Sequence, residues 1–176
     1  MKKYKAIAIP VSFADEKPKF LTVRDRRFKD WIFVTGGCRR REIFNPIRCA
    51  LRELEEETRG VLSLKNGEYT EFKFTVKESP LVDLEYSVFI FFVDYNKTQQ
   101  QNLIKKFYEE KQKTTLKKIQ KQPIKKTYDE NDYMSFDTLE EFNTRKRWKL
   151  IVDNILKNPE FYACVTSLNR KNFSIK

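Results

Sequence analysis

The chain has 176 residues, and its 36 lysines and arginines outnumber its 25 acidic residues to give a formal net charge of +11. It contains no histidine, which excludes Ser-His-Asp and Cys-His nucleophile systems and His-based zinc sites. The length suits a single domain over residues 1–176, and the positive charge favours a polyanionic partner.

Three widely spaced cysteines with no CxxC pair favour reduced thiols over a disulfide framework. No stretch reaches the roughly 20 apolar residues that a membrane-spanning helix needs. The apolar run at the basic N-terminus is broken by Pro10, so we expect no signal peptide. These features predict a cytoplasmic protein without membrane contact.

Apolar runs of strand length alternate with charged turns in the first part of the chain, at residues 5–13, 19–23 and 30–35. The third run ends at Gly36–Gly37, and a basic loop follows at residues 38–41. A helix is then predicted from Pro46 to Thr58, because Asn45 is a good N-cap and proline suits the first helical position. Gly60 can take the left-handed conformation that ends such a helix.

The second half of the chain begins with two predicted strands, at residues 71–76 and 84–93, of which the second is hydrophobic enough to be central. Residues 99–126 carry nine lysines and two glutamates, and loose helical spacing of apolar residues predicts a basic helical insertion ending at Pro123. After it we expect a short strand, a turn and an amphipathic helix, at residues 133–136, 138–142 and 147–156.

The predicted helix after Pro46 carries an unusual acidic run. Glu53, Glu56 and Glu57 stand at i, i+3 and i+4, so their carboxylates share one face and repel each other unless a cation lies between them. Such hard oxygen ligands suit Mg²⁺, and Arg52 at i−4 from Glu56 could hold that carboxylate in place. An ordinary solvated acidic face would have the same composition.

The surrounding pattern resembles the Nudix box, which reads glycine, five residues, glutamate, seven residues, then Arg-Glu-aliphatic-x-Glu-Glu-x-Gly-aliphatic. Gly36 and Glu42 have the family's spacing, and the run 52–57 (RELEEE) matches the rest. Two features depart from the pattern. Nine residues separate Glu42 from Arg52, which puts the role of Glu42 in doubt. Arg59 stands at the family's glycine, with Gly60 one place late, so the helix is expected to run slightly further.

The resemblance implies an α/β fold, an α/β/α sandwich around a mixed sheet, and Mg²⁺- or Mn²⁺-dependent hydrolysis of a diphosphate. By the same resemblance, Glu53, Glu56 and Glu57 would bind the metal and Arg52 would orient them. A further carboxylate on a later loop often acts as base or extra ligand. We expect Glu130 in this role, with Asp129 and Asp132 as alternatives, although an acidic surface turn would look the same.

Two basic segments bear on the substrate. The glycine pair and the arginine loop would contact the phosphates under attack, through Gly36, Gly37, Arg39, Arg40 and Arg41. The insertion would bind a longer polyanion through Lys117, Lys118, Lys121, Lys125 and Lys126. Capped RNA would use both segments, as in the decapping Nudix enzymes of large DNA viruses, which would place the protein in the host cytoplasm. Phe28, Trp31 and Tyr133 are candidates for stacking on a cap base, although each could belong to the core.

Two other functions remain open. The substrate could be a small polyphosphate, such as a diphosphoinositol polyphosphate, a dinucleoside polyphosphate or a nucleotide sugar, for which the arginines alone would suffice. Alternatively, the chain could be a non-catalytic RNA-binding module, although three mutually repelling carboxylates serve no purpose in a pure binder. The sequence leaves the oligomeric state open.

Overall fold

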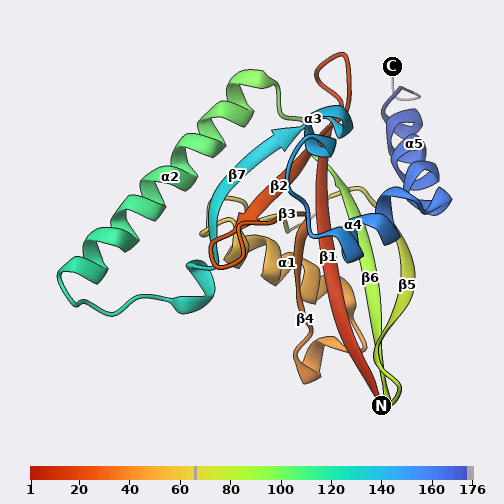
Figure 1. Cartoon of the computed structure of the whole chain (residues 1–176). Helices are drawn as coiled ribbons and strands as arrows, with labels where there is room; N and C mark the ends of the chain where they lie inside the picture. The colour runs from red at the N-terminus through yellow and green to blue at the C-terminus, as the bar shows by residue number, and fades with distance from the viewer. Residues whose placement is uncertain (66, 174–176) are drawn as a thin grey trace.

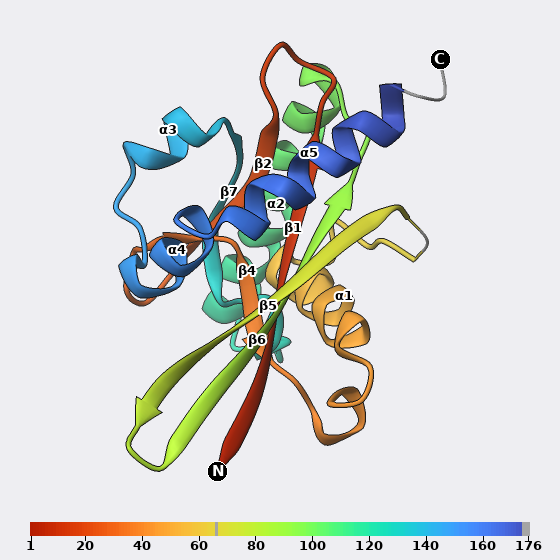
Figure 2. The same ribbon diagram turned by 90° about the vertical axis from the view of Figure 1, so that its right-hand side faces the viewer.

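The computed structural model describes residues 1–65 and 67–173. Within them, seven strands form one mixed sheet with helices on both sides (Figures 1 and 2), which confirms the predicted α/β class. The strands are β1 (Lys2–Ser12), β2 (Lys19–Asp25), β3 (Trp31–Ile32), β4 (Val34–Gly37), β5 (Tyr69–Ser79), β6 (Val82–Phe92) and β7 (Asn131–Asp137). The main path runs β3-β2-β1-β6-β5, while β4 pairs with β1 and β7 pairs with β2.

The centre of the sheet is the parallel pair of β1 and β6, in register at Ile7 and Val88. Both strands are buried over most of their length, so side chains pointing to either face must be apolar. This pair is flanked by two antiparallel strands, β2 next to β1 and β5 next to β6. The prediction that the second strand of the 71–93 region is central is confirmed.

The helices are α1 (Pro46–Glu57), α2 (Lys97–Ile119), α3 (Leu139–Asn143), α4 (Lys149–Leu156) and α5 (Pro159–Phe173), with 3-10 turns η1 (Arg40–Glu42) and η2 (Lys126–Tyr128). Helix α1 packs on β1 and β4, on the side of the sheet opposite α3 and α4 (Figure 2). Helix α5 packs on β5. In the described part of the chain, no helix combines the length and the apolar character required to cross a bilayer.

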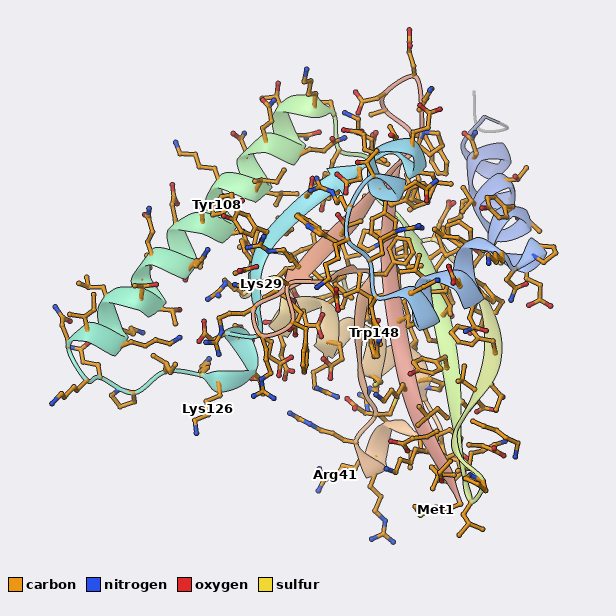
Figure 3. The ribbon with its side chains drawn as sticks, viewed as in Figure 1. Met1, Lys29, Arg41, Tyr108, Lys126 and Trp148 are labelled. Atoms are coloured by element: carbon orange, nitrogen blue, oxygen red, sulfur yellow. The ribbon has the colours of Figure 1, made fainter. Side chains whose placement is uncertain are left out.

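The predicted basic insertion is a projecting helix and a return segment, which we call the arm (residues 97–128). Near its middle, Phe107 is buried, and Tyr108 points toward the sheet (Figure 3), where its ring lies 5.7 Å from that of Tyr133 on β7. The end of α2 extends away from the body (Figure 1), leaving Leu116 and Ile119 exposed. The helix stops four residues before Pro123, which had been expected to end it.

Three predictions of local structure need correction. The run 30–35 forms two strands, because Trp31–Ile32 pair with β2 whereas Val34–Gly37 pair with β1. The expected turn at 138–142 is the short helix α3, which begins with a reciprocal capping box between Thr138 and Glu141. Helix α5 was missed, although Pro159 at its start and Asn158, which accepts a hydrogen bond from the Glu160 N–H, are start signals.

Candidate active site

Helix α1 holds the acidic run at the edge of the core. Ala50 and Leu54 are fully buried against the sheet, and Glu53 and Glu57 are largely buried beside them. Asn45 is the N-cap as predicted, but its side chain makes no capping hydrogen bond. The helix ends at Glu57, earlier than expected. Arg59 (φ 58°) and Gly60 (φ 78°) both take the left-handed conformation, so an arginine here adopts the backbone geometry suited to the family's glycine.

The end of β4 lies directly against the Glu53 side chain. A Cβ atom at Gly36 would lie 1.9 Å from the Glu53 carboxyl carbon, whereas one at Gly37 would meet nothing within 4 Å. The glycine at position 36 is therefore needed to make room for the carboxylate. The two glycines, which were predicted together as phosphate contacts, differ in their surroundings.

Arg52 connects the carboxylates of the motif. Its Nε and Nη2 donate to the two Glu42 carboxylate oxygens, each at 2.8 Å, and Nη1 donates to Glu53 (2.9 Å) and Glu56 (3.1 Å). The predicted Arg52–Glu56 contact is confirmed. The longer loop leaves Glu42 within reach of Arg52, because the turn at residues 43–45, in which the Asn45 N–H donates to Glu42 O at 3.0 Å, leads straight into α1. Glu42 also accepts a hydrogen bond from the Arg39 N–H at 2.8 Å.

The cluster carries more negative charge than its one central cation neutralises. Hydrogen bonding from Arg52 lowers the pKa of Glu42, but burial raises that of Glu53 to about 7, and the neighbouring Glu56 adds to the rise. Burial, and then repulsion from Glu53, raise the pKa of Glu57 well above its ordinary value. These two carboxylates thus lie where a positive charge would stabilise their ionised forms.

The donor set fits a divalent cation, because it consists of hard carboxylate oxygens with incompletely neutralised charge. In the described residues, no three acidic or thiol side chains are grouped closely enough to form a ready-made metal site. Glu53 and Glu56 are instead turned to Arg52, and Glu57 accepts a hydrogen bond from the Asn131 amide at 3.3 Å.

The segment after η2 brings a second acidic group to the site. Asp129 forms ion pairs with Arg59, Lys118 and Arg26. Asp132 is bound by two cations, Arg24 and Lys29. Glu130, between them, forms no ion pair within the described chain. Burial and the nearby Glu56 raise its pKa. Of the three predicted alternatives, Glu130 is therefore the carboxylate available for chemistry.

The arginine loop does not act as a unit. The Arg39 guanidinium lies 3.5 Å from a Glu56 carboxylate oxygen. Arg40 and Arg41 form the exposed turn η1, and Arg41 extends into solvent (Figure 3). Only one of the three predicted arginines thus contacts the carboxylate cluster.

A cavity of about 440 Å³ opens beside these carboxylates. We call it the acidic cavity, because its described lining contains four carboxylates and no basic side chain: Asp25, Phe28, Asp30, Ile32, Thr35, Glu57, Glu130, Asn131 and Trp148. Phe28 is 65% exposed and Trp148 is 39% exposed. Both are therefore aromatic surfaces open to a ligand.

Of the three aromatic residues predicted to stack on a base, only Phe28 lines this cavity. Trp31 is covered by Arg145, 3.8 Å from its ring centre, and Tyr133 by Arg24 at 4.1 Å. Trp148 was missed, because its place is set by a hydrogen bond of its backbone N–H to Trp31 O, a contact between residues 117 positions apart that no local pattern reveals.

The predicted lysines divide between two further cavities. A basic cavity of about 490 Å³ adjoins the acidic one and shares Asp25, Phe28 and Glu130 with it; its cations are Arg26, Arg27, Lys118 and Lys126. An arm cavity of about 460 Å³ is lined by Lys117 and Lys125. Lys121 lies in the exposed turn after α2 and lines neither.

The family model of the NUDIX domain matches residues 3–142. The chain belongs to the NUDIX family. It is a hydrolase of phosphate anhydrides, of the pyrophosphohydrolase type, and the family generally uses divalent metal ions such as Mg²⁺. Comparison with curated proteins gives no match.

Solved structures similar to this NUDIX chain share its fold at low identity. The NUDIX domain of Shewanella oneidensis NrtR, in complex with ADP ribose, has a TM-score of 0.55 and 11% identity over 86% of this chain and 83% of its own. The Caenorhabditis elegans Ap4A hydrolase has a TM-score of 0.51 and 11% identity, over 97% of this chain and 98% of its own. A NUDIX hydrolase from Nitrosomonas europaea has a TM-score of 0.51 and 12% identity, over 97% of this chain and 90% of its own.

Proposed function

We propose that this NUDIX hydrolase removes the methylated cap of messenger RNA and releases the methylated guanosine diphosphate. The observation that carries the proposal is the acidic cavity, which has two exposed aromatic side chains, Phe28 and Trp148, and four carboxylates. A 7-methylguanine base is flat and positively charged. Aromatic faces and carboxylates together favour such a base over a neutral or anionic group.

The position of the cavity supports cleavage of the adjacent diphosphate. Glu57 and Glu130 belong both to its lining and to the acidic site. A base held there would leave its phosphates beside α1. Glu53, Glu56 and Glu57 would hold a divalent ion, which would neutralise phosphate charge and lower the pKa of a bound water. Arg52 contacts Glu53 and Glu56 and would keep them in place, Glu130 would accept a proton from the attacking water, and Arg39 would contact a phosphate oxygen.

The adjoining basic cavity supplies a route for the RNA that follows the cap. Its four cations lie on two segments, the turn after β2 (Arg26, Arg27) and the arm (Lys118, Lys126). Asp129 partly neutralises Arg26 and Lys118, which leaves Arg27 and Lys126 as the freer phosphate contacts. Binding that depends on such contacts weakens with salt.

The test compares hydrolysis of capped RNA with and without the base's methyl group, in Mg²⁺, for Phe28→Ala and Trp148→Ala. Loss of one stacking surface costs about 1–3 kcal/mol, so kcat/KM for the methylated cap should fall about 5- to 150-fold, and the preference for the methylated base should shrink. Phe44→Ala, which removes another exposed aromatic ring, is the matched control. Unchanged preference in both cavity variants would refute the cap assignment.

A small polyphosphate is the second candidate, and the charge of the cavity separates the two. A diphosphoinositol polyphosphate is densely anionic, and the two carboxylates of the cavity that take no part in metal binding or proton transfer, Asp25 and Asp30, would repel it. A dinucleoside polyphosphate carries bases that could occupy the cavity, although without the positive charge. Product analysis on capped RNA, free cap dinucleotide, dinucleoside tetraphosphate and diphosphoinositol phosphate in parallel distinguishes them. Glu56→Gln is the inactive control, and turnover at the wild-type rate would contradict the metal assignment.

A further inference from the structure

The loop between α3 and α4 holds one aromatic wall of the acidic cavity, and we call its residues 145–148 the strap. The Trp31 N–H on β3 donates to Lys146 O at 2.7 Å, and the Trp148 N–H donates to Trp31 O at 3.1 Å. The strap therefore runs beside β3 in the parallel sense. It ends at Trp148, which lines the cavity.

Arg145 fastens the strap to the sheet. Its Nε and Nη2 donate to the two carboxylate oxygens of Asp137 on β7, at 2.7 and 3.0 Å. The Asp137 side chain is 1% exposed, and its oxygens also accept hydrogen bonds from the Thr22 hydroxyl at 2.9 Å and the Ser135 hydroxyl at 2.8 Å. A buried carboxylate bonded on both oxygens is a rigid anchor, because the surrounding donors fix its orientation.

Arg145 also covers the Trp31 ring, with its guanidinium carbon 3.8 Å from the ring centre. A planar guanidinium can stack on a ring and bond a carboxylate with two N–H groups at once, whereas an ammonium cannot. Trp31 in turn carries the backbone hydrogen bonds to the strap. Arg145 is therefore held between a buried anchor and the residue that places Trp148, although it is not part of the described cavity lining.

The opposite aromatic wall, Phe28, is held by its own turn. Its N–H donates to Asp25 Oδ1 at 2.6 Å. The strap adds a weaker link, because Lys146 Nζ donates to Phe28 O at 3.4 Å, but the Lys146 side chain is 73% exposed and such contacts contribute little. The spacing between the two rings therefore depends on where the strap places Trp148.

We propose that Arg145 is a positioning residue for base recognition, because it fixes the Trp148 ring at the spacing from Phe28 that a flat base requires. The inference rests on the proposed function in that a nucleobase occupies the acidic cavity. A gap of about 0.5–1 Å forfeits about a quarter to a half of the contact energy between stacked atoms. Within the described residues, Arg145 contacts neither Glu130 nor the carboxylates of α1, so its replacement should affect base binding and not the chemical step.

The test replaces Arg145 by lysine, which keeps a cation beside Asp137 but cannot both bond the two oxygens and cover the Trp31 ring. Arg147→Lys is the matched control, because that guanidinium donates to Asn143 on α3 at 2.9 Å. Dissociation constants are measured by calorimetry for 7-methylguanosine monophosphate and guanosine monophosphate, which contain no anhydride to hydrolyse. We expect Arg145→Lys to raise Kd for the methylated nucleotide about tenfold, as for the loss of a stacked surface, and the control to match wild type.

Two readouts separate positioning from a general loss of stability. On capped RNA in Mg²⁺, KM should rise with Kd while kcat stays close to wild type, whereas partial unfolding would lower kcat at unchanged KM. Amide hydrogen exchange reports on the strap itself. The N–H groups of Trp31 and Trp148 should exchange faster in Arg145→Lys than in Arg147→Lys.

Equal Kd values in the two variants would overturn the inference. Faster exchange without weaker base binding would do the same, and so would weaker binding with unchanged exchange, because Arg145 would then not act through the strap. A wild-type protein that binds both nucleotides equally would refute the cap assignment, and the inference would stand only if Arg145→Lys weakens both. A wild type that binds neither nucleotide would refute both, because no base would then occupy the cavity.

Discussion

Gly36→Ala should inactivate the hydrolase while leaving it folded. The added Cβ would lie 1.9 Å from the Glu53 carboxyl carbon, so the carboxylate must retreat by about 1.5 Å to reach the 3.4 Å of ordinary contact. It would then lose its 2.9 Å hydrogen bond from Arg52. Because a displacement of about 1 Å at a catalytic group can cost roughly 100-fold, we expect kcat to fall by about that factor. A flexible side-chain end can move aside, so Tm should change little.

The adjacent glycine is the control for this prediction. A Cβ at Gly37 meets nothing within 4 Å, and its backbone does not have a positive φ, so Gly37→Ala should stay within a few-fold of wild type. The assay is initial-rate hydrolysis of one anhydride substrate over a Mg²⁺ titration, with melting curves for each variant. If Gly36→Ala were as active as Gly37→Ala, Glu53 would not belong to the reacting cluster.

Two further predictions concern charged groups. Burial alone would raise the pKa of Asp132, but hydrogen bonds from Arg24 and Lys29 outweigh it and lower the pKa from 3.8 to about 2. The ionised carboxylate therefore stabilises the fold above pH 4, and this contribution is lost as pH falls toward 2. Asp132→Asn should cost about 1–2 kcal/mol at pH 7, after discounting for solvent around Lys29, and much less at pH 2.5. Urea unfolding at both values measures this, and an equal cost at both would contradict the assignment. Arg39→Ala should lower kcat/KM about tenfold through a lost charged contact, whereas Arg41→Ala should not; equal losses would mean that the exposed turn η1 closes over the substrate.

The part of the site that the sequence predicts is the part set by local geometry. Helical spacing alone brings Glu53, Glu56 and Glu57 to one side of α1, and places Arg52 one turn before Glu56. The contact between Arg52 and Glu42 was not predicted, because two extra residues lengthen the spacing and the turn at residues 43–45, which follows η1, restores the distance. The sequence favoured Glu130 over Asp129 and Asp132, but the physical reason that separates them, the ion pairs of Asp129 and Asp132 with distant segments, depends on the fold.

For the fold as well, the sequence predicts what depends on local periodicity and misses what depends on contacts between distant segments. Periodic segments such as α1 and β6 were predicted close to their observed bounds, whereas the run 30–35 changes partner strand within itself and reads as one strand. The acidic cavity depends on Phe28 and Trp148, which lie 120 positions apart in the sequence. Its aromatic and acidic character could therefore be recognised only after folding brings them together.

Arg59 connects two features that look unrelated in the sequence, the arginine at the motif's glycine position and the basic insertion. A non-glycine residue in the left-handed conformation costs about 1–2 kcal/mol, and here the side chain offers compensation that glycine could not. It bonds the residues on either side of Glu130, namely Asp129 and Asn131, and it packs on Phe107 from the arm. The arginine at the motif's glycine position and the arm inserted before β7 are thus one structural unit. Because that unit fixes the backbone around Glu130, the arm supports the active site as well as extending its positive surface.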